Sequence, residues 1–290
     1  MSGEGEFPFR TIAIAGLGLI GGSFALAVRE ARAAQTLIGL DLSPEHRAQA
    51  VELGLVDRAL ESFSALPPET DLLLLAVPVA SFPQVLQELA PHLSSDTILT
   101  DAGSVKGPLV EWMRRPDYAG IRFVPGHPIA GGERFGPQAA KSGLFRDKRF
   151  ILTPTTETDP EALQKVRRLW ESFGAEVQEM EAQTHDEIFA AVSHLPHLLA
   201  YASIQAIVSS DHPEALSHSG AGLKDFSRIA SSSPDMWSDI FLENQAPLLQ
   251  RVSVFRETLD ALEAAIRAGD RDTLRKLLLE AKEARDRWVR

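Results

Sequence analysis

Short apolar runs alternate with helix-length segments over the first 180 residues. The runs predict strands at residues 12–15, 37–40, 56–60, 71–77, 97–100, 121–124, 150–153 and 175–180. Helices are predicted between them at residues 23–34, 44–53, 82–93, 105–114 and 160–173. The run at 71–77 contains four consecutive leucines, which is typical of a parallel strand covered on both faces. The alternation predicts an α/β fold with a parallel, doubly wound sheet.

The strand pattern disappears after residue 183, and the remaining segments predict helices only. They cover residues 184–209, part of 214–228, 236–245, 247–267 and 273–288. Gly269 and Asp270 separate the last two as a glycine after one helix and an N-cap acid before the next. We therefore expect an α/β domain at residues 1–180 and an all-α domain at residues 181–290.

The first predicted strand runs directly into a glycine-rich turn, Gly16-Leu17-Gly18-Leu19-Ile20-Gly21. Gly16 permits the tight turn, Gly18 lets backbone approach a pyrophosphate, and Gly21 lets the following helix pack close to the strand. The helix N-terminus offers free N–H groups to the phosphates. Asp41 ends the second strand, where an acid accepts the ribose 2′-hydroxyl and repels a 2′-phosphate. The stretch predicts a Rossmann-type dinucleotide site that favours NAD over NADP.

Composition and charge exclude several classes of function. The formal net charge of −11 argues against nucleic acid binding, because a phosphate-binding surface is basic. The absence of cysteine excludes disulfides and thiol nucleophiles. Residues 1–10 lack the apolar segment of a signal peptide, so we expect a cytoplasmic protein.

Residues 188–208 are mostly apolar and about long enough to span a membrane. They also contain His194, Pro196, His197 and Gln205, which are unfavourable in lipid. A helix buried in protein, at a subunit interface, is the preferred interpretation, and no membrane is expected.

Ligands of doubly wound sheets bind beyond the carboxyl ends of the strands, so the residues that follow each strand are candidates. They are Val77-Pro78, Ser104 and His127. Ser104 stands where a helix N-cap belongs, and this structural role competes with a role in the site. His127 lies between Gly126 and Pro128 in a predicted loop, where it is either exposed and idle or catalytic.

Two histidines and an arginine stand out in the helical part. His194 and His197 are three residues apart and share a helix face, and Pro196 between them disturbs the helix. No HExxH pattern or further ligand accompanies them, so we expect no metal. They are either core histidines or ligands of an anion. Arg228 is a candidate for binding a substrate carboxylate, since its guanidinium matches a carboxylate bidentately.

Five segments together resemble the prephenate dehydrogenase family. They are Gly16–Ser23, Asp101–Lys106 (DAGSVK), Gly126–Gly131 (GHPIAG), Ser193–His197 (SHLPH) and Gly222–Ala230 (GLKDFSRIA), in the family's order. The resemblance implies oxidative decarboxylation of prephenate to 4-hydroxyphenylpyruvate with NAD, in tyrosine biosynthesis. Arogenate dehydrogenases share the pattern, so arogenate is the alternative substrate.

The resemblance also implies roles for individual residues. His127 matches the catalytic histidine that accepts the hydrogen bond of the substrate's ring hydroxyl, and Ser104 matches the serine that orients both. Arg228 matches the arginine that binds the ring carboxylate. The remaining matches line the substrate site: His194 and His197 of the SHLPH segment, and Trp237.

One segment departs from the family. Gly131-Gly132-Glu133 stands where the family often has Gly-Thr-Glu. The hydroxyl is therefore missing at Gly132, and Glu133 remains as a candidate for tuning substrate choice. The family further implies a homodimer formed by the helical domain, with the active site between the two domains.

Two other functional classes compete with this interpretation. A dehydrogenase of the β-hydroxyacid type would use a lysine of the helical domain, for which Lys224 is the candidate, and would leave the His127 segment unexplained. An NAD-sensing protein without turnover would bind the nucleotide and no substrate. The grouping of Ser104, His127, His197 and Arg228 around the expected nicotinamide position argues against the sensor.

Overall fold

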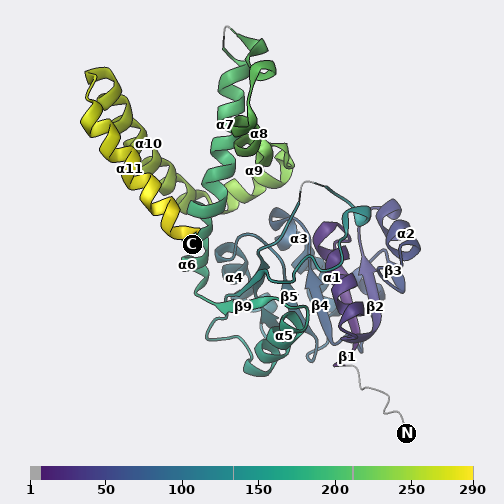
Figure 1. Cartoon of the computed structure of the whole chain (residues 1–290). Coiled ribbons are helices and arrows are strands. Elements are labelled where there is room, and N and C mark those ends of the chain that lie inside the picture. The colour runs from purple at the N-terminus through teal and green to yellow at the C-terminus, as the bar shows by residue number, and fades with distance from the viewer. Residues whose placement is uncertain (1–7, 133, 211, 290) are drawn as a thin grey trace.

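The computed structural model describes residues 8–132, 134–210 and 212–289, and its larger sheet is parallel throughout. The sheet has six strands in the order β3-β2-β1-β4-β5-β6 (Figure 1). The strands are β1 (Phe9–Ala15), β2 (Ala34–Leu40), β3 (Arg58–Leu60), β4 (Leu72–Leu75), β5 (Ile98–Asp101) and β6 (Arg122–Val124). This is the strand order of dinucleotide-binding folds, and it confirms the predicted doubly wound sheet.

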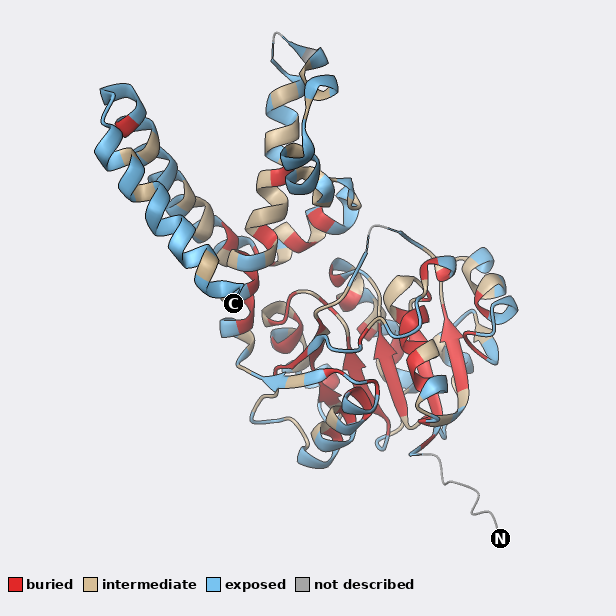
Figure 2. Ribbon diagram, in the orientation of Figure 1, coloured by how far each residue is buried: buried red, intermediate tan, exposed pale blue. Residues whose placement is uncertain are grey.

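Helices cover both faces of this sheet. They are α1 (Leu19–Glu30), α2 (Pro44–Glu52), α3 (Phe82–Leu89), α4 (Gly107–Met113) and α5 (Pro160–Ser172). Alternate residues of β1 enter two separate cores, Ile12 and Ile14 on one face and Ala13 and Ala15 on the other. Figure 2 shows the result, with the central strands β1, β4 and β5 buried almost throughout.

A second sheet follows that the sequence pattern did not separate from the first. It has three strands, β7 (Gly126–Pro128), β8 (Arg149–Leu152) and β9 (Glu176–Glu179), and β7 runs antiparallel to β8. Gly126 is required here, since a Cβ at this position would lie 2.3 Å from Cζ of Phe150. Phe150 in turn stacks on Trp170 of α5, with ring centroids 3.9 Å apart.

Helix α1 begins at Leu19, four residues before the predicted start at Ser23. Gly18 is its N-cap residue, and the N–H of Gly22 donates to the carbonyl of Gly18 at 2.8 Å. The apolar residues of the turn therefore belong to the first helical turn. The predicted N-caps of three other helices are confirmed: Ser43 for α2, Asp159 for α5 and Asp270 for α11 (Arg271–Trp288).

The C-terminal part consists of helices, as predicted. In addition to α11 they are α6 (Ala182–Phe189), α7 (Leu195–Val208), α8 (Ala221–Ser227), α9 (Pro234–Glu243) and α10 (Gln245–Ala268). In Figure 1, α7 and the α10–α11 hairpin extend away from the sheet. Strand β9 ends at Glu179 and α6 begins at Ala182, so the predicted division at residue 180 lies in the segment between these two elements.

Helix α6 continues into α7 through a π-helical turn, Ala190–His194. Pro196 lacks an N–H and so cannot donate to a preceding carbonyl, and the structure accommodates this as a widened turn. Among the described residues, one helical stretch, Ala182–Val208, is long and apolar enough to cross a membrane by composition alone. Only 11% of its most apolar window is buried. The single chain therefore leaves most of this stretch partly or fully exposed.

The glycine turn yields a prediction for stability. A Cβ at Gly21 would lie 1.9 Å from the carbonyl oxygen of Gly16, whereas a Cβ at Gly18 would meet nothing within 4 Å. We expect Gly21→Ala to lower the free energy of unfolding by more than about 2 kcal/mol. The matched control, Gly18→Ala, should cost less than about 1 kcal/mol, the range of a weakened N-cap. Urea denaturation of both variants measures the difference, and equal losses would contradict the prediction.

Candidate active site

The residues predicted to bind the dinucleotide meet at the carboxyl ends of β1, β2 and β4. Gly16 has a φ of +94°, and a Cβ on it would lie 2.4 Å from the carbonyl oxygen of Ala76 and 3.2 Å from Cγ1 of Val77. The glycine turn therefore lies directly against the segment that contains Val77 and Pro78. Only glycine, which has no Cβ, allows the backbone at residue 16 to come this close to the backbone of Ala76.

The start of α1 has the features of an anion site. Its N-cap, Gly18, has no side chain to cap the first-turn N–H groups, which belong to Leu19, Ile20 and Gly21. The space beside Gly18 is open to a ligand. Free N–H groups and the positive helix dipole together favour a pyrophosphate here.

Asp41 lies beside the same turn. One oxygen of its carboxylate accepts the N–H of Leu17 at 2.9 Å, and the other accepts the N–H of Ser43 at 2.9 Å. Both oxygens are thereby held at the end of β2, where an acid binds ribose hydroxyls. The turn and the acid together fit NAD.

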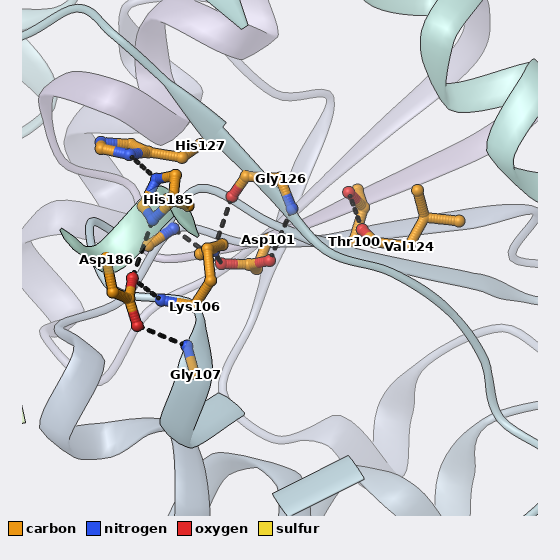
Figure 3. A network of polar contacts seen from close by, with 10 residues as sticks. Thr100, Asp101, Lys106, Gly107, Val124, Gly126, His127, His185 and Asp186 are labelled. Carbon is orange, nitrogen blue, oxygen red and sulfur yellow. Dashed lines mark hydrogen bonds and ion pairs between the residues drawn. The ribbon is translucent and has the colours of Figure 1, made fainter. Parts of the chain in front are cut away.

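His127 is half-buried on β7 and belongs to a chain of hydrogen bonds that joins it to α6 (Figure 3). Its Nδ1 lies 2.8 Å from Nε2 of His185, whose Nδ1 lies 2.8 Å from Oδ1 of Asp186. Asp186 also accepts the backbone N–H groups of Lys106 at 2.9 Å and of Gly107 at 2.7 Å. A residue of α6 thus caps the start of α4 and orients the partner of His127.

A buried ion pair supports the strand that carries His127. The ammonium of Lys106 pairs with the carboxylate of Asp101, and both side chains are fully buried. Lys106 Nζ also donates to the carbonyl of Gly126 at 2.7 Å, and Asp101 accepts the N–H of Gly126 at 2.9 Å. Burial lowers the pKa of Lys106, and the carboxylates of Asp101 and Asp186 oppose that shift. The pair fixes the peptide that precedes His127.

The environment keeps the two hydrogen-bonded imidazoles neutral. Burial holds the pKa of His127 well below its ordinary value of 6.5, and the nearby His185 and Lys106 lower it further. Burial also lowers the pKa of His185, against the opposing effect of Asp186. A neutral His127 is able to accept a proton, which is the property a general base requires.

Ser104 does not cap α4. The N-cap position is Lys106, without a side-chain cap, and the carboxylate of Asp186 takes that role. The structural alternative for Ser104 is therefore wrong. Its hydroxyl has no hydrogen-bond partner within the described part of the chain, and the bond at Nδ1 of His127 is made by His185. A contact of Ser104 with the substrate hydroxyl stays a prediction.

His194 is almost completely buried, with 1% of its surface exposed. Its Nδ1 accepts from Nδ2 of Asn244 at 2.9 Å, and the same amide donates to the backbone carbonyl of Asp186 at 2.9 Å. Burial lowers the pKa of His194 to about 4, so it is neutral at physiological pH. Only its Nε2 is left for a ligand.

His197, Trp237 and Arg228 lie together. The His197 ring stacks on the Trp237 indole with centroids 3.6 Å apart, and Nδ1 of His197 donates to the carbonyl of Ser193 at 2.9 Å. Burial lowers the pKa of His197, and the positive charge of Arg228 adds to that shift. Trp237 also joins the core on one face of the large sheet, so this group is attached to the α/β part.

The loop after β7 folds back over the glycine turn. A Cβ at Gly132 would lie 3.4 Å from Cδ2 of Leu19, so the departure from the family falls next to the start of α1. Glu133, the predicted specificity residue, lies outside the described residues. Within the described ranges, no group of three or more His, Asp or Glu side chains is placed to hold a metal ion.

Sequence reasoning missed the residues that support His127. Asp101 and Lys106 belong to the DAGSVK segment, which suggests no role for either of them, and the available signal is their spacing of five residues across a strand end. His185 and Asp186 showed only as an adjacent histidine and acid before an apolar helix, which is a weak signal.

The comparisons with known proteins agree over nearly the whole chain. Two family models match, described as prephenate dehydrogenase, nucleotide-binding domain (residues 24–179) and prephenate dehydrogenase, dimerization domain (residues 181–280). The prephenate dehydrogenase of Bacillus subtilis is 34% identical over 279 residues, which cover 95% of this chain and 75% of the relative.

Two solved structures are also similar. The prephenate dehydrogenase of Aquifex aeolicus, in complex with hydroxyphenyl propionate and NAD+, has a TM-score of 0.91 and 37% identity and covers 96% of this chain and 98% of that one. The Synechocystis arogenate dehydrogenase has a TM-score of 0.81 and 32% identity, with 96% and 99% covered.

The strand order, the glycine turn and the acid after β2 define an NAD-dependent oxidoreductase with a Rossmann-type domain and a helical C-terminal part. The matching family models and relatives identify one family within this class. The chain belongs to the prephenate dehydrogenase family, as its five sequence segments predicted.

The buried ion pair generates a prediction for stability. Lys106→Met leaves the carboxylate of Asp101 buried without its counter-charge, and breaking such a pair costs about 3–5 kcal/mol. The control, Lys282→Met, removes an exposed lysine that pairs with Asp286 on α11, and we expect little change there. Urea denaturation at neutral pH compares the two variants. Similar small losses in both would contradict a structural role for Lys106.

Proposed function

We propose that this chain catalyses the NAD-dependent oxidative decarboxylation of prephenate to 4-hydroxyphenylpyruvate. The observation that carries the proposal is a neutral His127 connected through neighbouring rings of the helical part to the charged Arg228. His194 lies near enough to His127 to lower its pKa, and it packs edge-on against Trp237. Trp237 stacks on His197, which feels the charge of Arg228.

In this proposal each group has a separate task. The guanidinium of Arg228 binds the ring carboxylate, since its fork matches a carboxylate bidentately. His127 accepts the proton of the ring hydroxyl, and Ser104 orients that hydroxyl. His197, His194 and Trp237 surround the substrate side chain. NAD, held by Gly16, Gly18, Gly21, Leu19, Ile20, Asp41, Val77 and Pro78, supplies the hydride acceptor.

The driving force comes from the substrate. The C–H bond at the hydroxyl-bearing carbon is broken as hydride leaves, and the electron pair of the C–CO₂⁻ bond enters the ring, which becomes aromatic. The protein then has to position donor and acceptor and to hold the hydroxyl proton during the transfer. The neutral imidazole of His127 and the guanidinium of Arg228 are the groups we assign to these two tasks.

Arogenate is the second candidate substrate, because one similar structure is an arogenate dehydrogenase. The two substrates differ in a keto or an amino group on the side chain, and Glu133 is the residue we propose for the choice between them. The test is NADH formation from each substrate, with NAD and with NADP. We expect turnover of prephenate with NAD. No turnover of either substrate, together with tight NAD binding, would refute the proposal in favour of an NAD sensor.

The roles of His127 and Arg228 predict opposite kinetic effects. His127→Asn should lower kcat by about 10²–10⁴-fold with little change in KM, the usual range for losing a general base. Arg228→Ala should raise KM roughly 10- to 100-fold, the effect of losing a charged hydrogen bond to a carboxylate. Arg114→Ala, which removes an exposed arginine paired with Glu111, is the control and should leave both constants unchanged. Near-normal turnover in His127→Asn would refute its role.

The pH dependence should differ between kcat/KM and kcat. In the free protein, burial holds the pKa of His127 well below 6.5, so the active neutral form persists through the ordinary histidine range. We therefore expect kcat/KM to fall only below that range. A bound dianion favours the protonated ring and raises this pKa, so kcat should begin to fall at a higher pH than kcat/KM. Coincident acidic limbs in the two pH profiles would contradict this assignment.

We further propose that the chain is a soluble, cytoplasmic homodimer formed through the helical part. The domain matched at residues 181–280 is described as a dimerization domain, and large apolar side chains are exposed there, including Val192 at 65% and Ile266 at 64%. A second copy would cover Ala182–Val208 without a membrane. Sedimentation equilibrium at micromolar concentration, without detergent, should give twice the chain mass. A monomer would refute the dimer, and a requirement for detergent would favour a membrane contact.

A further inference from the structure

His185 is a buried residue to which the proposed reaction assigns no task. It is 0% exposed, and its ring lies between the ring of His127 and the carboxylate of Asp186 (Figure 3). Both of its nitrogens take part in hydrogen bonds of 2.8 Å. Phe189 packs against both imidazoles, with centroids 5.0 Å from His127 and 4.4 Å from His185.

The positions of the protons follow from the end of this chain of hydrogen bonds. Backbone N–H groups donate to both oxygens of Asp186, one from Lys106 and one from Gly107. The carboxylate therefore acts as an acceptor only, and Nδ1 of His185 must donate to it. A neutral His185 then has its lone pair on Nε2, the nitrogen that faces His127.

The same logic applies one residue further along. Since Nε2 of His185 accepts, Nδ1 of His127 must carry the proton in their shared hydrogen bond. A neutral imidazole has one N–H, so Nε2 of His127 is left as an acceptor. Burial keeps the pKa values of both rings below the ordinary histidine value, which supports the neutral state that this argument needs.

We propose that His185, oriented by Asp186, is a positioning residue that holds His127 in the tautomer with Nδ1 protonated and Nε2 free to accept the substrate's hydroxyl proton. The inference rests on the proposed function, in which His127 is the base. The opposite tautomer would present an N–H to the hydroxyl and could not accept from it. A carboxylate that selects a histidine tautomer in this way is known from the Ser-His-Asp triad.

The proton balance of the step is simple. The O–H bond of the substrate breaks as a bond to Nε2 of His127 forms, while hydride leaves for NAD and the ring loses carbon dioxide. The phenolate oxygen of the product then takes the proton back. During the interval His127 is a cation, and its Nδ1–H still donates to His185, which places the Asp186 carboxylate one imidazole away from the new charge.

The direct test is the tautomer itself. Nitrogen-15 NMR of histidine-labelled protein with NAD bound distinguishes a protonated ring nitrogen from an unprotonated one, and the His127→Asn variant identifies the His127 signals. We expect Nδ1 of His127 to be protonated and Nε2 to be bare. A proton on Nε2 overturns the proposal, whether or not the protein turns over prephenate. Failure of the proposed function shows separately, as absent turnover in the unmodified protein.

Kinetics of two His185 variants provide the second test. His185→Leu removes the acceptor and should lower kcat roughly 10- to 100-fold with KM within about twofold, and should mix the His127 tautomers in the NMR spectrum. His185→Gln places an amide oxygen near the former Nε2 and should recover part of kcat. An unchanged kcat in His185→Leu would overturn the proposal. If this variant does not fold, the tautomer in the unmodified protein still decides.

Thr100→Val is the matched control for losing a buried polar group nearby. The Thr100 hydroxyl donates to the carbonyl of Val124 at 2.8 Å and lies in the same region of Figure 3 without touching His127 or His185. We expect it to lower stability while kcat and the His127 tautomer stay unchanged. A fall in kcat equal to that of His185→Leu would assign the effect to general destabilisation and overturn the proposal.

Discussion

The carboxylate of Asp186 is the interaction on which the arrangement of the site depends. It is an acceptor for the first N–H groups of α4, where a negative charge is stabilised by the helix dipole, and it orients His185. The backbone carbonyl of the same residue accepts from Asn244, which in turn binds His194. One residue of α6 thus connects an α/β helix, two imidazoles and the start of α10.

The buried ion pair of Lys106 and Asp101 holds the site on the side of the strand that carries His127. Burying two charges is costly, and here the cost is offset by mutual attraction and by further hydrogen bonds to the peptide groups of Gly126 and Gly103. The pair holds the strand of His127, and Asp186 holds its partner. The geometry of the base is therefore established by the protein before any ligand arrives, which is the condition for efficient general-base catalysis.

Features determined by neighbouring residues could be predicted from the sequence. The N-caps Ser43, Asp159 and Asp270 depend on contacts within a few positions, and the glycine turn and Asp41 follow a known spacing motif; the structure has them where expected, except that α1 starts earlier. The bond between His127 and His185 joins residues 58 positions apart, and no periodicity encodes it. Strand β7 was missed for a related reason, since its glycine and proline favour a loop unless Phe150 is known to pack against it.

The π turn at Ala190–His194 determines the phase between the two halves of the α6–α7 rod. In an α-helix each residue advances the side-chain direction by about 100°. A π turn contains one residue more than an α turn, so deleting one residue here would restore a regular helix and leave His185 and His197 close to their present directions. The same deletion inside α7 has no extra residue to remove and would turn the helix beyond it by about 100°. Changes of length are therefore better tolerated in this turn than in the regular helix on either side of it.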